Sequence, residues 1–492
     1  MSSYIIAIDQ GTTSSRAIVF DDALQIVATA QQEIANTFPQ PGWVQQDAAE
    51  IWSSVKAVIT RVVEKAHISV SDVKGIGITN QRETTIVWDR RTGKPVHDAL
   101  VWQSRQTADL CDRAIDAGWE KIVKAKTGLM IDPYFSGSKI RWILDRIPDG
   151  QKRAAAGELY FGNVDSWLAY NLTAGRCHVT DVTNASRTML MNIDSRQWDE
   201  ELLSIWDIPA AMLPQIKPSS CVYGTTDILG PDIPIASMIG DQQAALFGQM
   251  CFEKGQAKNT YGTGCFLLFN TGTERVNSKS GLVTTIGWQI GDEVAYALEG
   301  SVFVAGAAIQ WLRDGLKVIS NSSETEKIAE ELPDSGGVYV IPAFTGLGAP
   351  YWRKDSRGAI FGLTRGTTTA HLIRATLESL AYQSYDVINA MTADTGVRLD
   401  TLQVDGGACR NNYLMQFQAD LLQKEILRPV VFETTAMGAA MMAGLAVGVF
   451  PSKAELKAHY AVDRVFKPLM TVGQSQELLE GWSRAIHATM EF

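Results

Sequence analysis

The stretch Asp9-Gln10-Gly11-Thr12-Thr13-Ser14-Ser15-Arg16 decides the fold of this 492-residue chain. It follows the apolar run Tyr4–Ile8 and precedes a second one, Ala17–Phe20, which predicts a strand, a tight turn and another strand. Glycine lets the backbone approach a ligand closely, and successive N–H groups in such a turn form a nest for anions. Asp9 can hold Mg²⁺ and Arg16 can balance phosphate charge. The turn suits the phosphates of a metal-bound nucleotide, although an ordinary β-hairpin has the same pattern.

The pattern restarts near residue 240. Pro234–Gly240 predicts a strand and Gln242–Gly248 a helix, and Gly255–Phe269 again predicts strand, small-residue turn and strand. A chain of this length is too long for one core. We therefore expect an α/β protein made of two copies of one sheet topology, residues 1–247 and 248–492, with a polar turn from each copy facing a shared cleft.

A third turn follows the apolar run Leu402–Val404. Asp405-Gly406-Gly407 brings bare backbone to the end of a strand, and a helix starting at Asn412 offers its N–H groups to a ligand. Alone, this segment is equally well a glycine turn capped by Asn. Together with the first turn it predicts the nucleoside side of one nucleotide site.

Two further segments carry candidate acceptor groups. Asp241 closes a strand and opens a helix, so it can be a helix N-cap, a general base at the mouth of a cleft, or both at once. The polar run Thr79–Thr85 stands between apolar runs, so Arg82 and Glu83 can bracket vicinal hydroxyls rather than lie on a solvated surface. Three aromatic residues could wall such a pocket, or belong to the plain core: Trp102, Tyr134 and Phe266.

The composition excludes several classes of protein. The net charge is −10 without a basic tract, which argues against nucleic acid and anionic membranes as partners. The N-terminus has no signal-peptide pattern, and the longest apolar run, Met437–Phe450, is too short to span a bilayer. Six scattered cysteines favour a reducing cytoplasm. No spacing indicates structural zinc or a Ser/His/Asp triad.

In this order, the segments resemble the FGGY carbohydrate kinase family, which has the actin-like ATPase fold of two duplicated ribonuclease H-like domains. The resemblance covers essentially the whole chain. Two signatures carry it: Tyr134–Asp145, with Lys139 and Trp142, and Gly362–Thr364 together with His371–Glu378. Three segments are similar to those of glycerol-phosphorylating members: Asn80–Thr85, Gly240–Gly248 and Asn259–Phe266.

The resemblance implies ATP-dependent phosphorylation of glycerol to sn-glycerol 3-phosphate in glycerol catabolism, in the cytoplasm, by a homodimer or homotetramer. It implies Asp241 as the general base, Asp9 as the residue that orders Mg²⁺, and ATP as the phosphoryl donor. The implied glycerol-binding residues are Arg82, Glu83, Trp102, Tyr134, Asp241, Gln242 and Phe266. The implied phosphate and nucleotide residues are Thr12, Thr13, Ser14, Arg16, Thr263, Gly306, Gln310, Gly407 and Asn411.

Relatives can carry regulatory groups, a basic loop for a sugar bisphosphate or a phosphorylatable His, in the stretch that corresponds to 223–234. Here that stretch contains no Arg, Lys or His, which argues against both modes of control. The alternatives are a kinase for another small polyol or ketose, a non-catalytic nucleotide sensor on the same fold, and an actin- or chaperone-like ATPase.

Overall fold

The computed structural model describes residues 3–230 and 232–492, which form two compact units. Pro231, in the stretch considered for regulation, lies outside the described residues. Each unit is built from three segments of the chain. Unit 1 contains Met1–Met250, Thr284–Tyr296 and Glu433–His459, and unit 2 contains Cys251–Val283, Ala297–Phe432 and Tyr460–Phe492. The division of the sequence into halves at residue 247 stays a prediction.

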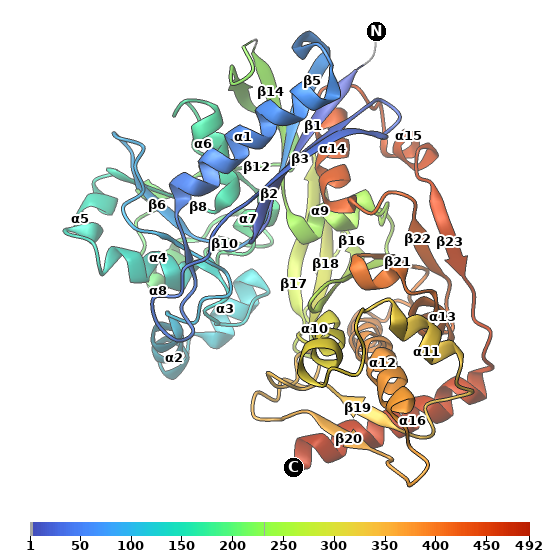
Figure 1. Ribbon diagram of the computed structural model, residues 1–492. Helices are drawn as coiled ribbons and strands as arrows, with labels where there is room; N and C mark the ends of the chain where they lie inside the picture. The colour runs from blue at the N-terminus through green and yellow to red at the C-terminus, as the bar shows by residue number, and fades with distance from the viewer. Residues whose placement is uncertain (1–2, 231) are drawn as a thin grey trace. The chain divides into compact units, whose positions relative to one another are not determined.

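Unit 1 is organised around a mixed sheet (Figure 1). Strand β1 pairs antiparallel with β2, which pairs antiparallel with β3; on its other side β1 pairs parallel with β5, and β5 with β14. β13 then pairs antiparallel with β14 and meets β17. The strands are β1 Tyr4–Gln10, β2 Ser14–Phe20, β3 Ile26–Glu33, β5 Val73–Asn80, β13 Ser220–Thr226, β14 Ile233–Gly240 and β17 Val283–Ile290.

Helices cover both faces of this sheet. Successive side chains of a strand point to opposite faces, and in β5 Ile76 and Ile78 join the core formed with helices α1 (Ala48–Ala66) and α6 (Val164–Leu172). Gly77 faces the other way, where a Cβ would lie 2.4 Å from the backbone oxygen of Ala439, on helix α14 (Thr434–Ala446). Glycine at this position therefore lets α14 pack directly on the strand.

The rest of unit 1 consists of short elements. They comprise β4 Gln45–Gln46, β6 Ile86–Asp89, β7 Ala99–Leu100, α2 Ala108–Asp116, α3 Glu120–Thr127, α4 Ser136–Leu144, α5 Gly150–Ala155, β8 Leu159–Gly162, β9 Val179–Asp181, α7 Val182–Ala185, β10 Met191–Asn192, β11 Gln197–Trp198, α8 Glu200–Trp206, β12 Gln215–Lys217, α9 Asp241–Gly248 and α15 Lys453–Ala458. The predicted strand 234–240 and helix 242–248 correspond to β14 and α9.

Unit 2 repeats the topology of unit 1. Strand β15 pairs antiparallel with β16 and parallel with β21; β21 pairs parallel with β22, and β22 pairs antiparallel with β23. β18 lies beside β16. The strands are β15 Ala257–Tyr261, β16 Cys265–Gly272, β18 Glu293–Val302, β21 Leu402–Asp405, β22 Ile426–Pro429 and β23 Val462–Phe466. Both units thus contain a first strand with an antiparallel hairpin partner on one side and two successive parallel pairings on the other, which supports the predicted duplication, and the α/β class is confirmed.

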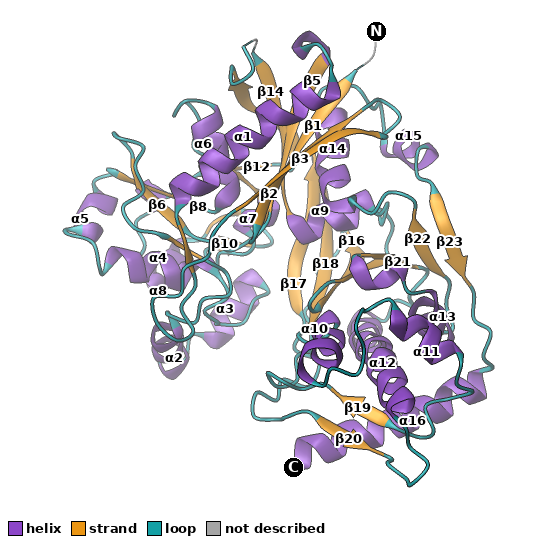
Figure 2. Ribbon diagram, viewed as in Figure 1, coloured by secondary structure: helices purple, strands orange, loops and turns teal. Residues whose placement is uncertain are grey.

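The two longest helices of unit 2, α12 and α16, contact each other (Figure 2). The 27-residue α12 carries Tyr382, whose ring stacks on that of Trp482 with centroids 4.9 Å apart. The helices of this unit are α10 Gly306–Gln310, α11 Glu324–Glu330, α12 Thr369–Thr395, α13 Asn412–Leu422 and α16 Val472–Glu491, and a short strand pair joins β19 Tyr339–Ile341 to β20 Ala359–Phe361. Within residues 3–230 and 232–492, no helix is both long and apolar enough to cross a membrane.

Candidate active site

In unit 1, polar side chains gather where the parallel strands β5 and β14 end. Asn80 and Gly240 are the last residues of these two neighbouring strands and are paired in register. Arg82 and Glu83 follow β5 and are almost fully buried, with 3% and 1% of their surfaces exposed. Charged residues are rarely buried to this extent unless they are paired. The polar run after β5 is therefore part of a built site and not a solvated surface.

Arg82 connects three of the predicted site residues. Its Nε lies 3.2 Å from Oδ1 of Asp241, and its Nη2 donates a 3.3 Å hydrogen bond to the hydroxyl of Tyr134. Its Nη1 donates to Oε1 of Gln243 at 3.1 Å. Gln243, which the sequence analysis did not assign to the site, is fully buried and donates in turn to the Ile286 carbonyl at 3.3 Å.

Glu83 is held in an unusual conformation. Its φ of 58° places it in the left-handed region, which is uncommon for residues other than glycine and is found preferentially at functional sites. Its Oε1 accepts a 2.5 Å hydrogen bond from Nε of Arg187, and its backbone oxygen accepts one from the hydroxyl of Ser136 at 3.1 Å. Arg187 is the second site residue that sequence reasoning missed.

Two aromatic rings form one wall of the cluster. Trp102 and Tyr134 meet edge to face, with centroids 5.7 Å apart. The indole Nε1 of Trp102 donates a 2.9 Å hydrogen bond to Oγ1 of Thr12, in the turn between β1 and β2. The wall is thereby fixed to the turn that the sequence assigns to phosphates. Phe266, predicted to join this wall, lies on β16 of unit 2 and is half-buried.

Asp241 is the first residue of α9, and its side chain is 30% exposed. The N-cap of α9 is Gly240, so the reading of Asp241 as a simple N-cap is wrong. Its Oδ1 accepts from the backbone N–H of Gln242 at 2.7 Å. Gln242 is half-buried beside it. The carboxylate of Asp241 thus stays partly accessible while Arg82 and the helix fix its position.

Hydrogen bonds fix the conformation of the turn between β1 and β2. The Gly11 N–H donates to the Ser14 carbonyl at 2.9 Å, and Nε2 of Gln46 donates to the Thr12 carbonyl at 2.6 Å. Thr13 is exposed at the tip. Arg16, assigned to phosphate, forms a 2.6 Å ion pair with Glu433, the residue just before α14, and both side chains remain partly exposed. A phosphate at this turn would share Arg16 with Glu433.

The carboxyl group of Asp9, near the end of β1, interacts electrostatically with two other carboxylates. Burial raises the pKa of the Asp9 carboxyl to about 7; Arg16 lowers it, whereas Asp241 and Glu433 raise it. Within residues 3–230 and 232–492, no three His, Cys, Asp or Glu side chains form a metal-holding group of their own. The site fits Mg²⁺, which typically takes one or two carboxylates together with water and substrate phosphates. Asp9, near the end of β1, is one such carboxylate.

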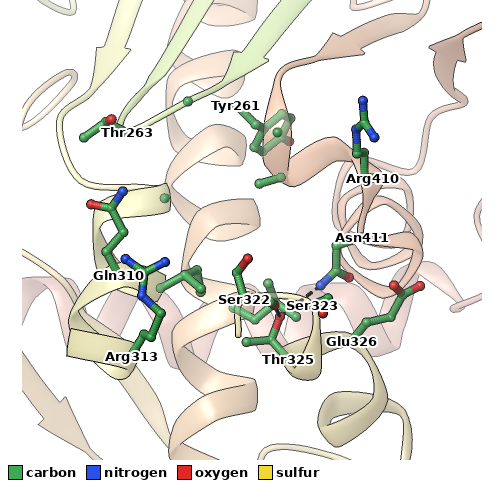
Figure 3. A pocket seen from close by; sticks show the side chains of 16 residues that line it. Tyr261, Thr263, Gln310, Arg313, Ser322, Ser323, Thr325, Glu326, Arg410 and Asn411 are labelled. Carbon is green, nitrogen blue, oxygen red and sulfur yellow. Dashed lines mark hydrogen bonds between the residues drawn. The ribbon is translucent and has the colours of Figure 1, made fainter. Parts of the chain in front are cut away.

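Unit 2 contains a pocket of about 430 Å³ (Figure 3), within the usual size range of small-molecule sites. It brings together five residues that the sequence analysis assigned to the nucleotide: Thr263, Gly306, Gln310, Gly407 and Asn411. They come from the β15–β16 turn, from α10 and from the turn after β21.

The backbone of this pocket requires glycine at two places. Gly406 has a φ of +87°, and a Cβ there would lie 2.4 Å from the Tyr261 backbone oxygen. A Cβ on Gly306 would lie 2.5 Å from the Gly262 backbone oxygen. The turns after β15 and β21 therefore touch each other and α10, and only bare backbone lets them form one pocket wall.

One side of the pocket was not predicted from the sequence. Asn411 caps α13 by accepting from the Leu414 N–H at 2.9 Å, and its Nδ2 donates to Oγ1 of Thr325 at 3.2 Å. Glu326 accepts at 2.7 Å from Nδ2 of Asn412. The lining residues that sequence reasoning missed include Arg313, Ser322, Ser323, Thr325, Glu326 and Arg410. All but Arg410 lie in loops and short helices whose sequences carry no motif, and Arg410 lies in the turn after β21 that was singled out without assigning this side chain.

Comparison with known proteins gives a consistent result. Residues 4–248 match the profile of the FGGY family of carbohydrate kinases, N-terminal domain, and residues 257–447 match that of the C-terminal domain. The chain is 56% identical over 495 residues to a glycerol kinase of Geobacillus sp. (strain WCH70), covering 100% of both. It is also 56% identical over 492 residues to a glycerol kinase of Listeria monocytogenes serovar 1/2a, covering 99% of both.

Solved structures show the same similarity. The crystal structure of Plasmodium falciparum glycerol kinase with ADP matches with a TM-score of 0.94 at 37% identity, covering 99% of this chain and 98% of that one. Gluconate kinase from Lactobacillus acidophilus matches with a TM-score of 0.89 at 20% identity, covering 100% and 99%. The second similarity shows a shared fold alone.

Proposed function

Because the chain belongs to the FGGY family of carbohydrate kinases, we propose that it transfers the γ-phosphoryl group of ATP to glycerol, giving sn-glycerol 3-phosphate. The observation that carries the proposal is the buried cluster in unit 1, where Arg82 contacts both Asp241 and Tyr134 and is followed directly by Glu83. A small polyol is the ligand whose chemistry this cluster fits.

Arg82 and Glu83 bind the acceptor hydroxyls in this proposal. A guanidinium donates and a carboxylate accepts, so adjacent groups of the two kinds can satisfy two neighbouring hydroxyls. Tyr134 adds a third polar group, and Gln242 lies beside Asp241. Trp102 packs against the carbon chain. Hydrogen bonds to charged groups contribute about 1.5–3 kcal/mol each, so every contact to so small an acceptor is important.

Asp241 is the general base. It is a partly exposed carboxylate on the first turn of a helix, fixed at 3.2 Å from Arg82, and it can accept the proton of the attacking hydroxyl. Arg82 places a positive charge beside this carboxylate. The same arginine thus positions both the acceptor and the base.

The nucleotide occupies the pocket in unit 2. Gly306, Gln310, Gly407 and Asn411 line it, and Thr263 reaches the phosphates from the β15–β16 turn. The β1–β2 turn of unit 1 is the second segment proposed to bind phosphate oxygens, through Thr12, Thr13, Ser14 and Arg16. When bound, Mg²⁺ neutralises charge on the transferring phosphoryl group, and Asp9 holds it.

The reaction is assigned to the cytoplasm, where ATP is the common phosphoryl donor. Burial raises the pKa of the Cys111 and Cys265 thiols to about 12, so these two cysteines are small apolar core groups and not redox centres. This behaviour is typical of a protein that folds in a reducing compartment.

Product analysis tests the proposal. Purified protein is incubated with Mg-ATP and glycerol, and the product is identified by phosphorus NMR and by a stereospecific glycerol 3-phosphate dehydrogenase. We expect one sn-glycerol 3-phosphate for each ADP formed. ADP formed without phosphorylated glycerol, or no ADP despite nucleotide binding, would reject the proposal in favour of an ATPase or a sensor.

A further inference from the structure

We propose that Arg187 is a positioning residue that sets the affinity for the acceptor by fixing Glu83 and the ring of Tyr134, an inference that rests on the proposed function of this site. Arg187 follows the short helix α7 and is fully buried, and its Nε donates to Oε1 of Glu83 at 2.5 Å. It contacts Glu83 and Tyr134, the two residues proposed to bind the acceptor.

Arg187 holds three parts of the site together. Its guanidinium carbon lies 5.5 Å from the ring centroid of Tyr134 and 5.2 Å from that of Phe135. Its backbone oxygen accepts from the Ser136 N–H at 3.4 Å, at the start of α4. The hydroxyl of Ser136 donates to the backbone oxygen of Glu83. One residue therefore connects the turn after β5 to the segment that carries Tyr134.

Stability alone does not account for this arrangement. Desolvating two opposite charges costs about as much as their attraction returns, so a buried ion pair is weak grounds for a stabilising role. Glu83 also has a left-handed backbone, which non-glycine residues adopt at an energetic cost. Such costs persist where the surrounding structure holds a group in a functional geometry. A planar guanidinium fixes the orientation of a carboxylate, which a lysine cannot do in the same way.

The position of Arg187 is in turn fixed by the network at Asp181. The carboxylate of Asp181 accepts from the N–H groups of Thr183 and Asn184, at 3.0 and 2.9 Å, and caps α7. Oγ1 of Thr183 accepts from the N–H of Gly240 at 2.9 Å, one residue before Asp241. The hydrogen bonds of Asp181 and Thr183 therefore hold both the helix that precedes Arg187 and the residue that precedes Asp241.

The test substitutes Arg187→Lys, which keeps the positive charge and removes the planar fork. We expect the KM for glycerol to rise at least about tenfold, with the KM for Mg-ATP and the Kd for ADP within twofold of wild type. The matched control is Arg374→Lys in unit 2, which alters a second buried arginine, whose Nε donates to Glu378 at 2.8 Å. The control is expected to lower the melting temperature and to leave the glycerol KM unchanged.

A second variant covers the case in which Arg187→Lys does not fold. Phe135→Leu removes one ring beside the guanidinium without burying an unpaired charge, and we expect it to raise the glycerol KM at least about threefold. Wild-type glycerol KM in whichever of these variants folds, while the wild-type protein phosphorylates glycerol, overturns the inference alone. No glycerol turnover in the wild-type protein overturns the proposed function itself.

Discussion

Replacing Asp241 by asparagine tests the assignment of the general base. Asparagine has the same size, and its Oδ1 can still accept from the Gln242 N–H, now at 2.7 Å, and from Arg82, whose Nε lies 3.2 Å away. The substitution removes the capacity to take up a proton and the negative charge that faces Arg82. Because general-base catalysis contributes about 10²- to 10⁴-fold, we expect kcat to fall by at least about 10²-fold.

Stability and binding should change little in the same variant. Asparagine can keep the contact with the buried Arg82, and the charge of Arg82 still faces Glu83 at 3.9 Å, so the variant should fold with at most a modestly lower melting temperature. Arg82 and Glu83 remain, so the glycerol KM should rise by less than tenfold. This separates loss of the base from loss of the binding site.

The assay is coupled ADP release at saturating Mg-ATP over a range of glycerol concentrations, with melting curves on the same samples. Asp199→Asn is the matched control, because Asp199 is an ion-paired carboxylate of unit 1, 2.7 Å from Nζ of Lys126, outside the site. Its kcat should stay within about twofold of wild type. A kcat for Asp241→Asn within tenfold of wild type would refute Asp241 as the base.

Three further predictions follow from specific contacts. Gly306→Ala places a Cβ 2.5 Å from the Gly262 oxygen and should weaken ADP binding at least about tenfold by calorimetry, whereas Gly473→Ala, with nothing within 4 Å, should not; equal affinities would contradict the pocket wall. Trp102→Phe removes the 2.9 Å hydrogen bond to Thr12, so glycerol kcat/KM should fall about two- to tenfold, and an unchanged value would remove that contact from the site. Burial, with the carboxylate of Asp181 nearby, raises the pKa of Asp165 to about 7, so the folded protein keeps this proton to a higher pH than the unfolded chain, and the stabilisation is lost as the pH rises through 7. From pH 5 to pH 8, wild type should lose about 2–3 kcal/mol more unfolding free energy in urea than Asp165→Asn; parallel losses would contradict the raised pKa.

Much of the fold was predictable because its signals are local. The turn after Tyr4–Ile8 and the similar turn after β15 are short patterns of apolar strands and small residues, and the structure places both in the first hairpin of matching sheets. The sequence did not predict that the segment Glu433–His459 returns to unit 1. The sequence shows Met437–Phe450 as an apolar run too short to span a bilayer, but the packing of α14 on Gly77 depends on a contact between distant segments.

The site residues likewise fall into two groups, those that their local sequence marks and those that it does not. Arg82 and Glu83 stand in a polar run between apolar runs, so their own neighbours in the sequence mark them. Arg187 and Gln243 act on them from 104 and 161 positions away, and no local pattern shows that an arginine or a glutamine will be buried against a particular partner. Thr325 and Glu326 were missed for a similar reason, since they reach the pocket only through the packing of α11 against α13.

The cluster around Arg82 and Glu83 is proposed to select a three-carbon polyol as the phosphoryl acceptor. The most direct test is to measure kcat/KM with Mg-ATP for glycerol, dihydroxyacetone, erythritol and xylulose, with a no-acceptor control. We expect the kcat/KM for glycerol to exceed that for every other acceptor by at least about tenfold, because a pocket that pairs each hydroxyl discriminates against acceptors that leave its polar groups unpaired. A higher kcat/KM for any of the other three would contradict it.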